Sequence, residues 1–369
     1  MRKAETVPCF PFFCAVFVCR LIALFTFIIT DSESFPAGDR SVVFLPFLLT
    51  GMLAAVPVLL VIGRKEDRTL FTLTNSVSPL FSKTAAVLYA AGAIWSEGIS
   101  LTRFDLFMST VMFSGARLWG LILLLTVCAV AVAGRGVRTT VRMSVLVLAL
   151  AGLSMLYAGV TAGREFDVAN LDPPLRNGVL PLFRNSFSAV ARTGELAALL
   201  VYAPQVRGGV KKGVFFWFLS FGLTVSLLYT LIMGVTGAYG ERQMFQLYAL
   251  TVLSKIGAVE RLDALICAVW VLCSLTRLSF YLLTAGRFLH AGFGLRENAG
   301  LYAPLCAAVF AVYLPLSGSV TAFSAVLRSG VNEIVFALLV PALPLTALAA
   351  AGIKNRKATN KTLMKGALE

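Results

Sequence analysis

The chain holds a series of apolar stretches, each close to 20 residues long, and this feature limits the folds open to it. A helix of about 20 apolar residues spans the hydrocarbon core of a bilayer. We predict ten spans, at about 8–30, 41–62, 84–102, 118–134, 143–162, 186–205, 213–236, 262–286, 299–317 and 332–352. The alternation of polar and apolar residues that is typical of membrane β-strands does not occur. The sequence therefore predicts an all-α membrane protein.

The composition agrees with a single polytopic membrane domain over residues 1–369. Of these residues 58% are hydrophobic and 14% are charged, whereas soluble domains carry about 25% charged residues. The seven cysteines all fall in apolar stretches, and the chain has one histidine, His290. Because free cysteine behaves as a small apolar residue and no metal-ligand spacing occurs, we predict neither a metal site nor a cofactor.

The net charge of +14 fits a membrane topology. Lys and Arg concentrate in the cytoplasmic loops of membrane proteins. If the N-terminus is cytoplasmic, the predicted inside segments hold 19 basic and five acidic residues, which accounts for the whole net charge. We therefore predict that both termini are cytoplasmic and that residues 353–369 form a basic cytoplasmic tail.

Four ionisable residues fall within the predicted spans, namely Arg20, Glu97, Glu195 and Arg277. Such residues are costly at bilayer depth, and they usually face a protein interior or a water-filled cavity. One interpretation is a set of ion pairs between helices that fixes their packing. The other is the lining of a binding site or an ion pathway, in which Glu97 and Glu195 are the candidates for carrying a proton or an ion.

The sixth predicted span has polar residues at its centre, in the stretch NSFSAVARTGELAALLVYAP at 185–204. Glycine in a helix interior costs about 1 kcal/mol relative to alanine. Gly194 is flanked by Arg192, Thr193 and Glu195, so we predict an unwound segment here. The first choice as partner of Glu195 is Arg20, and the second is Arg277.

Unwound helices of transporters place binding sites at the bilayer midplane, often in corresponding helices of two repeats. Ten spans divide into a first repeat at about 8–162 and a second at about 186–352, which pairs the first span with the sixth. We therefore expect both of these helices to be discontinuous. The predicted ligand-binding residues are Arg20, Arg192, Thr193, Gly194, Glu195 and Arg277.

Several stretches resemble a known family. They are LTRFDLFMSTVMFSGARLW at 101–119, AGRGVRTTVRMS at 133–144, NLDPPLRNGVLPLFRNSFSAVARTGELAALLVYAPQV at 170–206 and GERQMFQLYALTVLSKIGAVERLDALICAVWVLCSLTRLSFYLLTAGRF at 240–288. In order and spacing they are similar to the B-subunit (GerAB-type) endospore germination proteins of the amino acid–polyamine–organocation transporter superfamily. The first span departs from the family pattern, because CAVFVCRLIALF holds Arg20 and no glycine.

The resemblance implies a LeuT-like fold of two inverted five-helix repeats. It also implies residence in the spore inner membrane with an A-type membrane subunit and a C-type lipoprotein as partners. The implied function is that of a germinant-receptor subunit, which senses a small nutrient such as an amino acid and signals to its partners.

The residues leave a second function open, a stand-alone proton-coupled amino acid transporter that uses Glu97 or Glu195 as the coupling carboxylate. An intramembrane enzyme is a poor fit, because no Ser/His/Asp or metal-ligand spacing accompanies His290. We therefore predict no enzymatic activity.

Overall fold

The computed structural model describes residues 6–25, 39, 41–63, 69–113, 118–171, 173, 175, 178–191, 193–241, 243–253 and 263–366. The long helices are α1 (Cys9–Phe25), α3 (Phe44–Ile62), α5 (Pro79–Val111), α6 (Trp119–Gly134), α7 (Val137–Ala162), α10 (Val210–Glu241), α12 (Asp263–Phe293), α13 (Ala299–Tyr313) and α16 (Leu343–Gly366). Shorter helices are α4 (Leu70–Val77), α8 (Val179–Val190), α9 (Leu199–Tyr202), α11 (Gln246–Leu253), α14 (Val320–Arg328) and α15 (Val331–Ala337). The chain also forms the 3-10 helix η4 (Gly194–Ala198) and the π-helical turn η6 (Leu338–Ala342).

Five helices in the described residues are long and apolar enough to cross a membrane, and three shorter helices are also apolar. All eight coincide with predicted spans. The two remaining predictions, 84–102 and 186–205, fall on α5 and on the segment from α8 to α9. These two segments carry the buried charged residues Glu97 and Glu195. The all-helical membrane fold is thus confirmed, and the count of ten spans stays a prediction.

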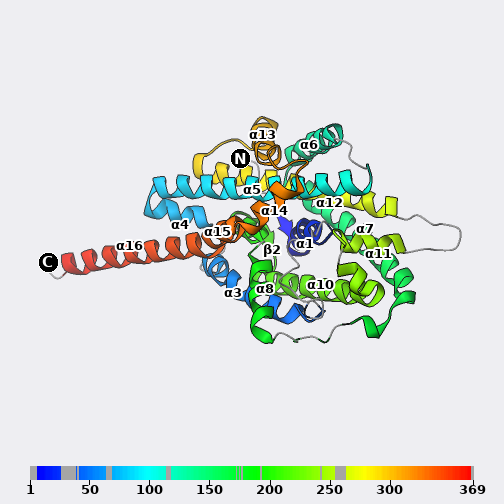
Figure 1. Ribbon diagram of the computed structural model, residues 1–369. Helices are drawn as coiled ribbons and strands as arrows, with labels where there is room; N and C mark the ends of the chain where they lie inside the picture. Colours follow the sequence, from blue (N-terminus) through cyan, green and yellow to red (C-terminus); the bar gives the residue numbers. More distant parts are fainter. Residues whose placement is uncertain are drawn as a thin grey trace.

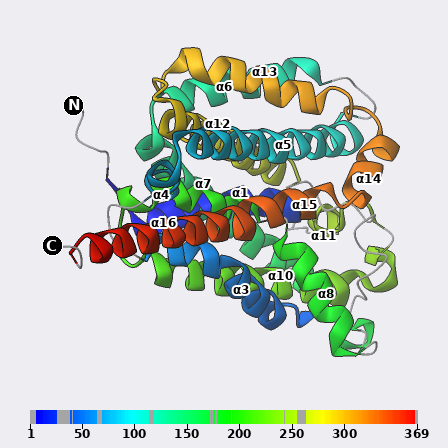
Figure 2. The same ribbon diagram turned by 90° about the vertical axis from the view of Figure 1, so that its left-hand side faces the viewer.

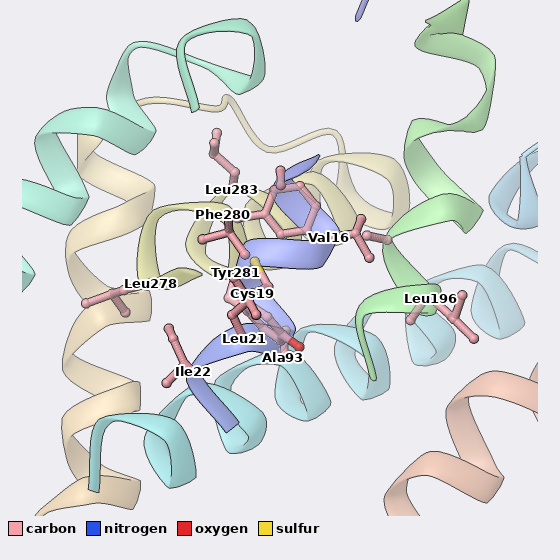
Figure 3. Packing of buried hydrophobic residues seen from close by; sticks show 14 of the residues in the cluster. Val16, Cys19, Leu21, Ile22, Ala93, Leu196, Leu278, Phe280, Tyr281 and Leu283 are labelled. Carbon is pink, nitrogen blue, oxygen red and sulfur yellow. The ribbon is translucent and has the colours of Figure 1, made fainter. Parts of the chain in front are cut away.

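α1 and α12 form the centre of the bundle. Figure 2 shows α6 and α13 stacked above α5 and α12, with α3 and α10 on the far side of α1. In the apolar 18-residue stretch of α12, 78% of the residues are buried, whereas in those of the other four long spans 28% to 39% of the residues are buried. Apolar side chains of α1 and α12, among them Cys19, Ile22, Leu278 and Phe280, pack together there (Figure 3). A helix in this position faces protein on all sides, so it can carry polar residues away from lipid.

The sixth predicted span is divided in the structure. The α-helix α8 ends at Val190, and the next helical turn, η4, begins at Gly194. The hydroxyl of Thr193 donates to the carbonyl of Val190 at 2.6 Å, which gives that carbonyl a partner where the helix stops. Arg192 lies outside the described residues.

The first span is different, because α1 is one α-helix from Cys9 to Phe25. The interruption that we expected here is not found between these two residues. The physical reason is in the sequence, where Pro11 lies in the first helical turn and no glycine follows it in the helix. Proline is tolerated in a first turn, since the N–H that it lacks would have no partner there.

A short parallel strand pair joins these two segments. β1 (Val7–Pro8) precedes α1, and β2 (Val206–Arg207) follows the sixth predicted span, with Val7 opposite Val206. The start of the first span is therefore tied through its backbone to the end of the sixth.

The last span begins with a break of another kind. Gly330 precedes α15 with a left-handed φ of 72°, and α15 leads through η6 into α16. Pro341 lies inside η6, and proline removes a backbone donor, which favours a local π turn. The hydroxyl of Tyr89 donates to the carbonyl of Leu339 at 2.7 Å in this turn. The predicted basic tail continues α16 as far as Gly366, and this end of the helix projects from the bundle (Figure 1).

Candidate ligand site

Arg277 lies at the centre of a buried ion cluster. Its Nε atom donates to Glu97 Oε2 at 3.0 Å, and its Nη1 atom donates to Glu195 Oε1 at 2.9 Å. The three residues come from α12, α5 and η4, and none is more than 6% exposed. With both carboxylates ionised, the cluster carries one net negative charge. Buried charges are stabilised only where polar partners replace the lost water.

The guanidinium group of Arg277 is fully occupied. Besides the two carboxylates, Nη1 donates to the backbone carbonyl of Cys19, and Nη2 donates to Ser96 Oγ at 3.0 Å and to the Ser96 carbonyl at 3.4 Å. A guanidinium has five N–H donors, and five acceptors are present. The ring of Tyr281, four residues along α12, has its centroid 4.4 Å from Arg277 Cζ. Arg277 therefore joins α1, α5, η4 and α12, and it has no donor left for a ligand.

Glu195 differs from Glu97 in one respect. The Oε2 atom of Glu195 is buried and has no hydrogen-bond partner among the described residues. An ionised carboxylate can accept about four hydrogen bonds, and a buried acceptor without a partner costs about 1–3 kcal/mol. This oxygen is therefore the place in the cluster where a further donor would be bound.

A cavity of about 250 Å³ lies beside the cluster. Its walls come from α1, α3, α5, α8, η4, α10, α12, α15 and η6. The charged residues that line it are Arg20, Arg103, Glu195 and Arg277. Small-molecule sites are typically apolar cavities with a few placed polar groups, at the junction of several elements. The cavity has this character.

The structure brings four of the predicted ligand-binding residues to the cavity wall, namely Arg20, Gly194, Glu195 and Arg277. Thr193 is fully buried, and its hydroxyl donates a hydrogen bond to the Val190 carbonyl. Glu97 lies behind the wall in the ion cluster. Whether these residues bind a ligand stays a prediction.

The prediction that Arg20 would be the partner of Glu195 is wrong, since the partner is the second choice, Arg277. Arg20 Nη2 instead donates to the carbonyl of Ala189 at 2.8 Å, and its Cζ atom lies 5.8 Å from the ring centroid of Phe221. Arg20 still lines the cavity, but its side chain lies beside the end of α8 and not in the ion cluster.

Sequence reasoning missed several residues of the site. Ser96 and Tyr281 contact Arg277, and Arg103 lines the cavity. A signal existed for the first two, because Ser96 precedes Glu97 and Tyr281 lies one helical turn after Arg277. Trp95 and Asn332 form a hydrogen bond of 2.9 Å between α5 and α15 at the cavity wall, and no sequence pattern pointed to it.

Among the described residues, no cysteine and no histidine lines the cavity, although the backbone carbonyl of Cys19 accepts a hydrogen bond from Arg277 in the ion cluster. All seven cysteines are free, and Cys128 is exposed on the bundle surface. His290 is exposed, with Nδ1 2.7 Å from the carbonyl of Leu295. No group of metal-ligating side chains occurs within the described residues.

Solved structures place the fold in the class of LeuT-type membrane transporters. A substrate-bound, outward-open Na⁺-coupled sialic acid symporter is 12% identical, with a TM-score of 0.57 over 90% of this chain and 79% of the symporter. A mutant of the manganese transporter from Eremococcus coleocola is 13% identical, with a TM-score of 0.50 over 92% of this chain and 77% of the transporter. At these identities the likeness shows the fold alone.

The family follows from the sequence. The model of the permease family described as "spore germination protein" matches residues 42–319. The chain therefore belongs to the spore germination protein family, and its family and fold are of the permease type rather than of an enzyme type. No curated protein sequence matches the chain.

Proposed function

We propose that this chain is the nutrient-sensing membrane subunit of a spore germinant receptor. The observation that carries the proposal is the cavity lined by Glu195, a residue whose buried Oε2 atom has no hydrogen-bond partner among the described residues and which follows the end of α8 in the sixth span. An amino acid offers an ammonium group to this oxygen and a carboxylate to Arg20. Binding triggers a response only if the ligand has different affinities for two states of the protein, and Gly194 is the hinge between those states.

The rest of the proposal follows from the family. The chain would lie in the spore inner membrane with both termini in the cytoplasm, and it would signal to an A-type and a C-type subunit. Its ten spans would form two inverted repeats, at about 8–162 and 186–352. The divided sixth span would be the discontinuous helix of the second repeat, and η4 would move relative to α8.

The substitution Glu195→Gln tests the sensing site. We expect germination in response to nutrients to fall at least tenfold, because the change removes a charge-assisted hydrogen bond to the ammonium group, and such bonds contribute about 1.5–3 kcal/mol. The amide oxygen still accepts from Arg277, so the fold is retained. The measurement is the loss of optical density of spores exposed to a panel of amino acids.

The matched control is Glu165→Gln, at an exposed carboxylate in the turn after α7. We expect this variant to germinate like the unmodified protein. An unchanged nutrient response in the Glu195 variant, at equal protein level in the spore membrane, would remove Glu195 from the sensing site.

A second candidate function is proton-coupled amino acid transport. The observation that favours it is the pair of buried carboxylates in a transporter fold, since Glu97 and Glu195 share one guanidinium. Labelled amino acids would then accumulate in proteoliposomes that contain this chain alone, and a proton uncoupler would abolish the uptake. Binding without accumulation would favour the receptor.

A further inference from the structure

We propose that the ligand is an amino acid with a large apolar side chain, held by its ammonium group on Glu195 Oε2. This inference rests on the proposed function and names the ligand class of the same site. Its basis is the contrast between the two kinds of wall around the cavity: one end is an ion cluster with a single unpartnered oxygen, and most of the remainder is aromatic or aliphatic.

The ammonium group is the primary point of recognition because of the charges in the cluster. Two carboxylates face one guanidinium, so an additional positive group balances the cluster. Arg277 uses all five of its donors within the protein and cannot bind the carboxylate of a ligand. The ammonium therefore contributes more to binding than the carboxylate, which Arg20 or Arg103 receives at the cavity wall.

The apolar walls select the side chain. Aromatic residues from five helices line the cavity, among them Phe47, Trp95, Phe221, Phe280, Phe288 and Phe336. A leucine or phenylalanine side chain placed against these walls is removed from water, which is favourable in proportion to the apolar area buried. Alanine leaves the space largely unfilled. An acidic side chain would lose its hydration and lie near the negative cluster, which is unfavourable.

Small residues on the wall leave room for such a side chain. Ala93 in α5 and Ala197 in η4 both line the cavity. Gly92 allows Leu339 to approach α5 closely, since a Cβ atom there would lie 2.2 Å from Leu339 Cδ1. Adding volume at Ala93 therefore reduces the space for a large ligand more than the space for a small one.

The test is direct binding to the purified full chain in detergent. The probes are L-leucine, L-phenylalanine, L-alanine, L-aspartate, phenethylamine and 3-phenylpropionate, measured by calorimetry and by the shift of the melting temperature. We expect leucine or phenylalanine to bind at least tenfold more tightly than alanine, since each methylene in an apolar pocket changes affinity about tenfold or more. We also expect phenethylamine, which keeps the amine, to bind more tightly than 3-phenylpropionate, which keeps the carboxylate.

Two variants sharpen the test. Glu195→Gln is expected to weaken phenylalanine and phenethylamine alike, by about tenfold or more. Ala93→Val is expected to weaken phenylalanine more than alanine, whereas the control Ala149→Val, on the exposed face of α7, leaves both unchanged. Melting of each variant without ligand reports whether it is folded.

The outcomes separate this inference from the proposed function. If alanine or aspartate binds more tightly than leucine and phenylalanine, or if 3-phenylpropionate binds better than phenethylamine, the inference is overturned and amino acid sensing stands. If the folded protein binds none of the amino acids, both fail.

Discussion

Replacing Arg277 with leucine is expected to destabilise the protein by about 3–5 kcal/mol, because the change leaves two buried carboxylates without their cation. Glu97 and Glu195 would then face each other in an apolar interior, and the carbonyl of Cys19 and the hydroxyl of Ser96 would lose a donor. The measurement is the melting temperature in detergent, together with the yield of monodisperse protein.

Arg287→Leu is the matched control. Arg287 lies on the same helix and pairs with Glu297, but its side chain is 26% exposed. Exposed ion pairs contribute about 0–1 kcal/mol, so we expect a small shift. Adding Glu97→Gln and Glu195→Gln to the Arg277 variant is expected to recover part of the loss. Equal melting of the Arg277 and Arg287 variants would show that the buried cluster does not hold the bundle together.

The second large effect is expected at Gly98, next to Glu97 in α5. A Cβ atom on this residue would lie 2.5 Å from both Cβ and Cγ1 of Val312 in α13, and 3.3 Å from the backbone carbonyl of Val309. The branched valine cannot swing away, so Gly98→Ala pushes the two helices apart. Overpacking of this kind costs about 1–3 kcal/mol. We expect a lower melting temperature, and we expect ligand affinity to change because Glu97 is displaced. Both quantities are measured on the purified variant.

Gly152→Ala provides the comparison. Gly152 lies in α7, where an added Cβ atom meets nothing within 4 Å. There the substitution is expected to leave stability unchanged or to raise it by up to about 1 kcal/mol, since alanine favours the helix. If Gly98→Ala melts like Gly152→Ala, the close contact between α5 and α13 is not a constraint on packing.

Hydropathy and helix-weakening residues made much of the fold predictable from sequence. The apolar runs located eight helices, because a bilayer requires both length and apolarity. Gly194 and its polar neighbours marked the place where α8 gives way to η4. The interruption expected in the first span is not found over Cys9–Phe25, since this part of the chain holds nothing that interrupts a helix beyond its first turn.

The partner of Glu195 could not be predicted, because hydropathy gives the depth of a residue but not the direction it faces. In α1, the Cys19 carbonyl meets Arg277, while the next side chain, Arg20, turns to Ala189. Consecutive helix positions differ by about 100° in direction. The cavity could not be predicted from the sequence either, since nine separate elements contribute to its walls.

The parallel pairing of Val7 with Val206 is the point about which α1 and the sixth predicted span would rotate relative to one another. α1 begins directly after one strand of this pair, and the segment that carries Glu195 ends at the other, so the two segments are held together there. A small tilt at this strand pair would give a larger displacement farther along both segments, where Arg20 meets Ala189. The lever arm is the length of α1, and the packing of α1 in the core resists the tilt together with the backbone hydrogen bonds of the strand pair.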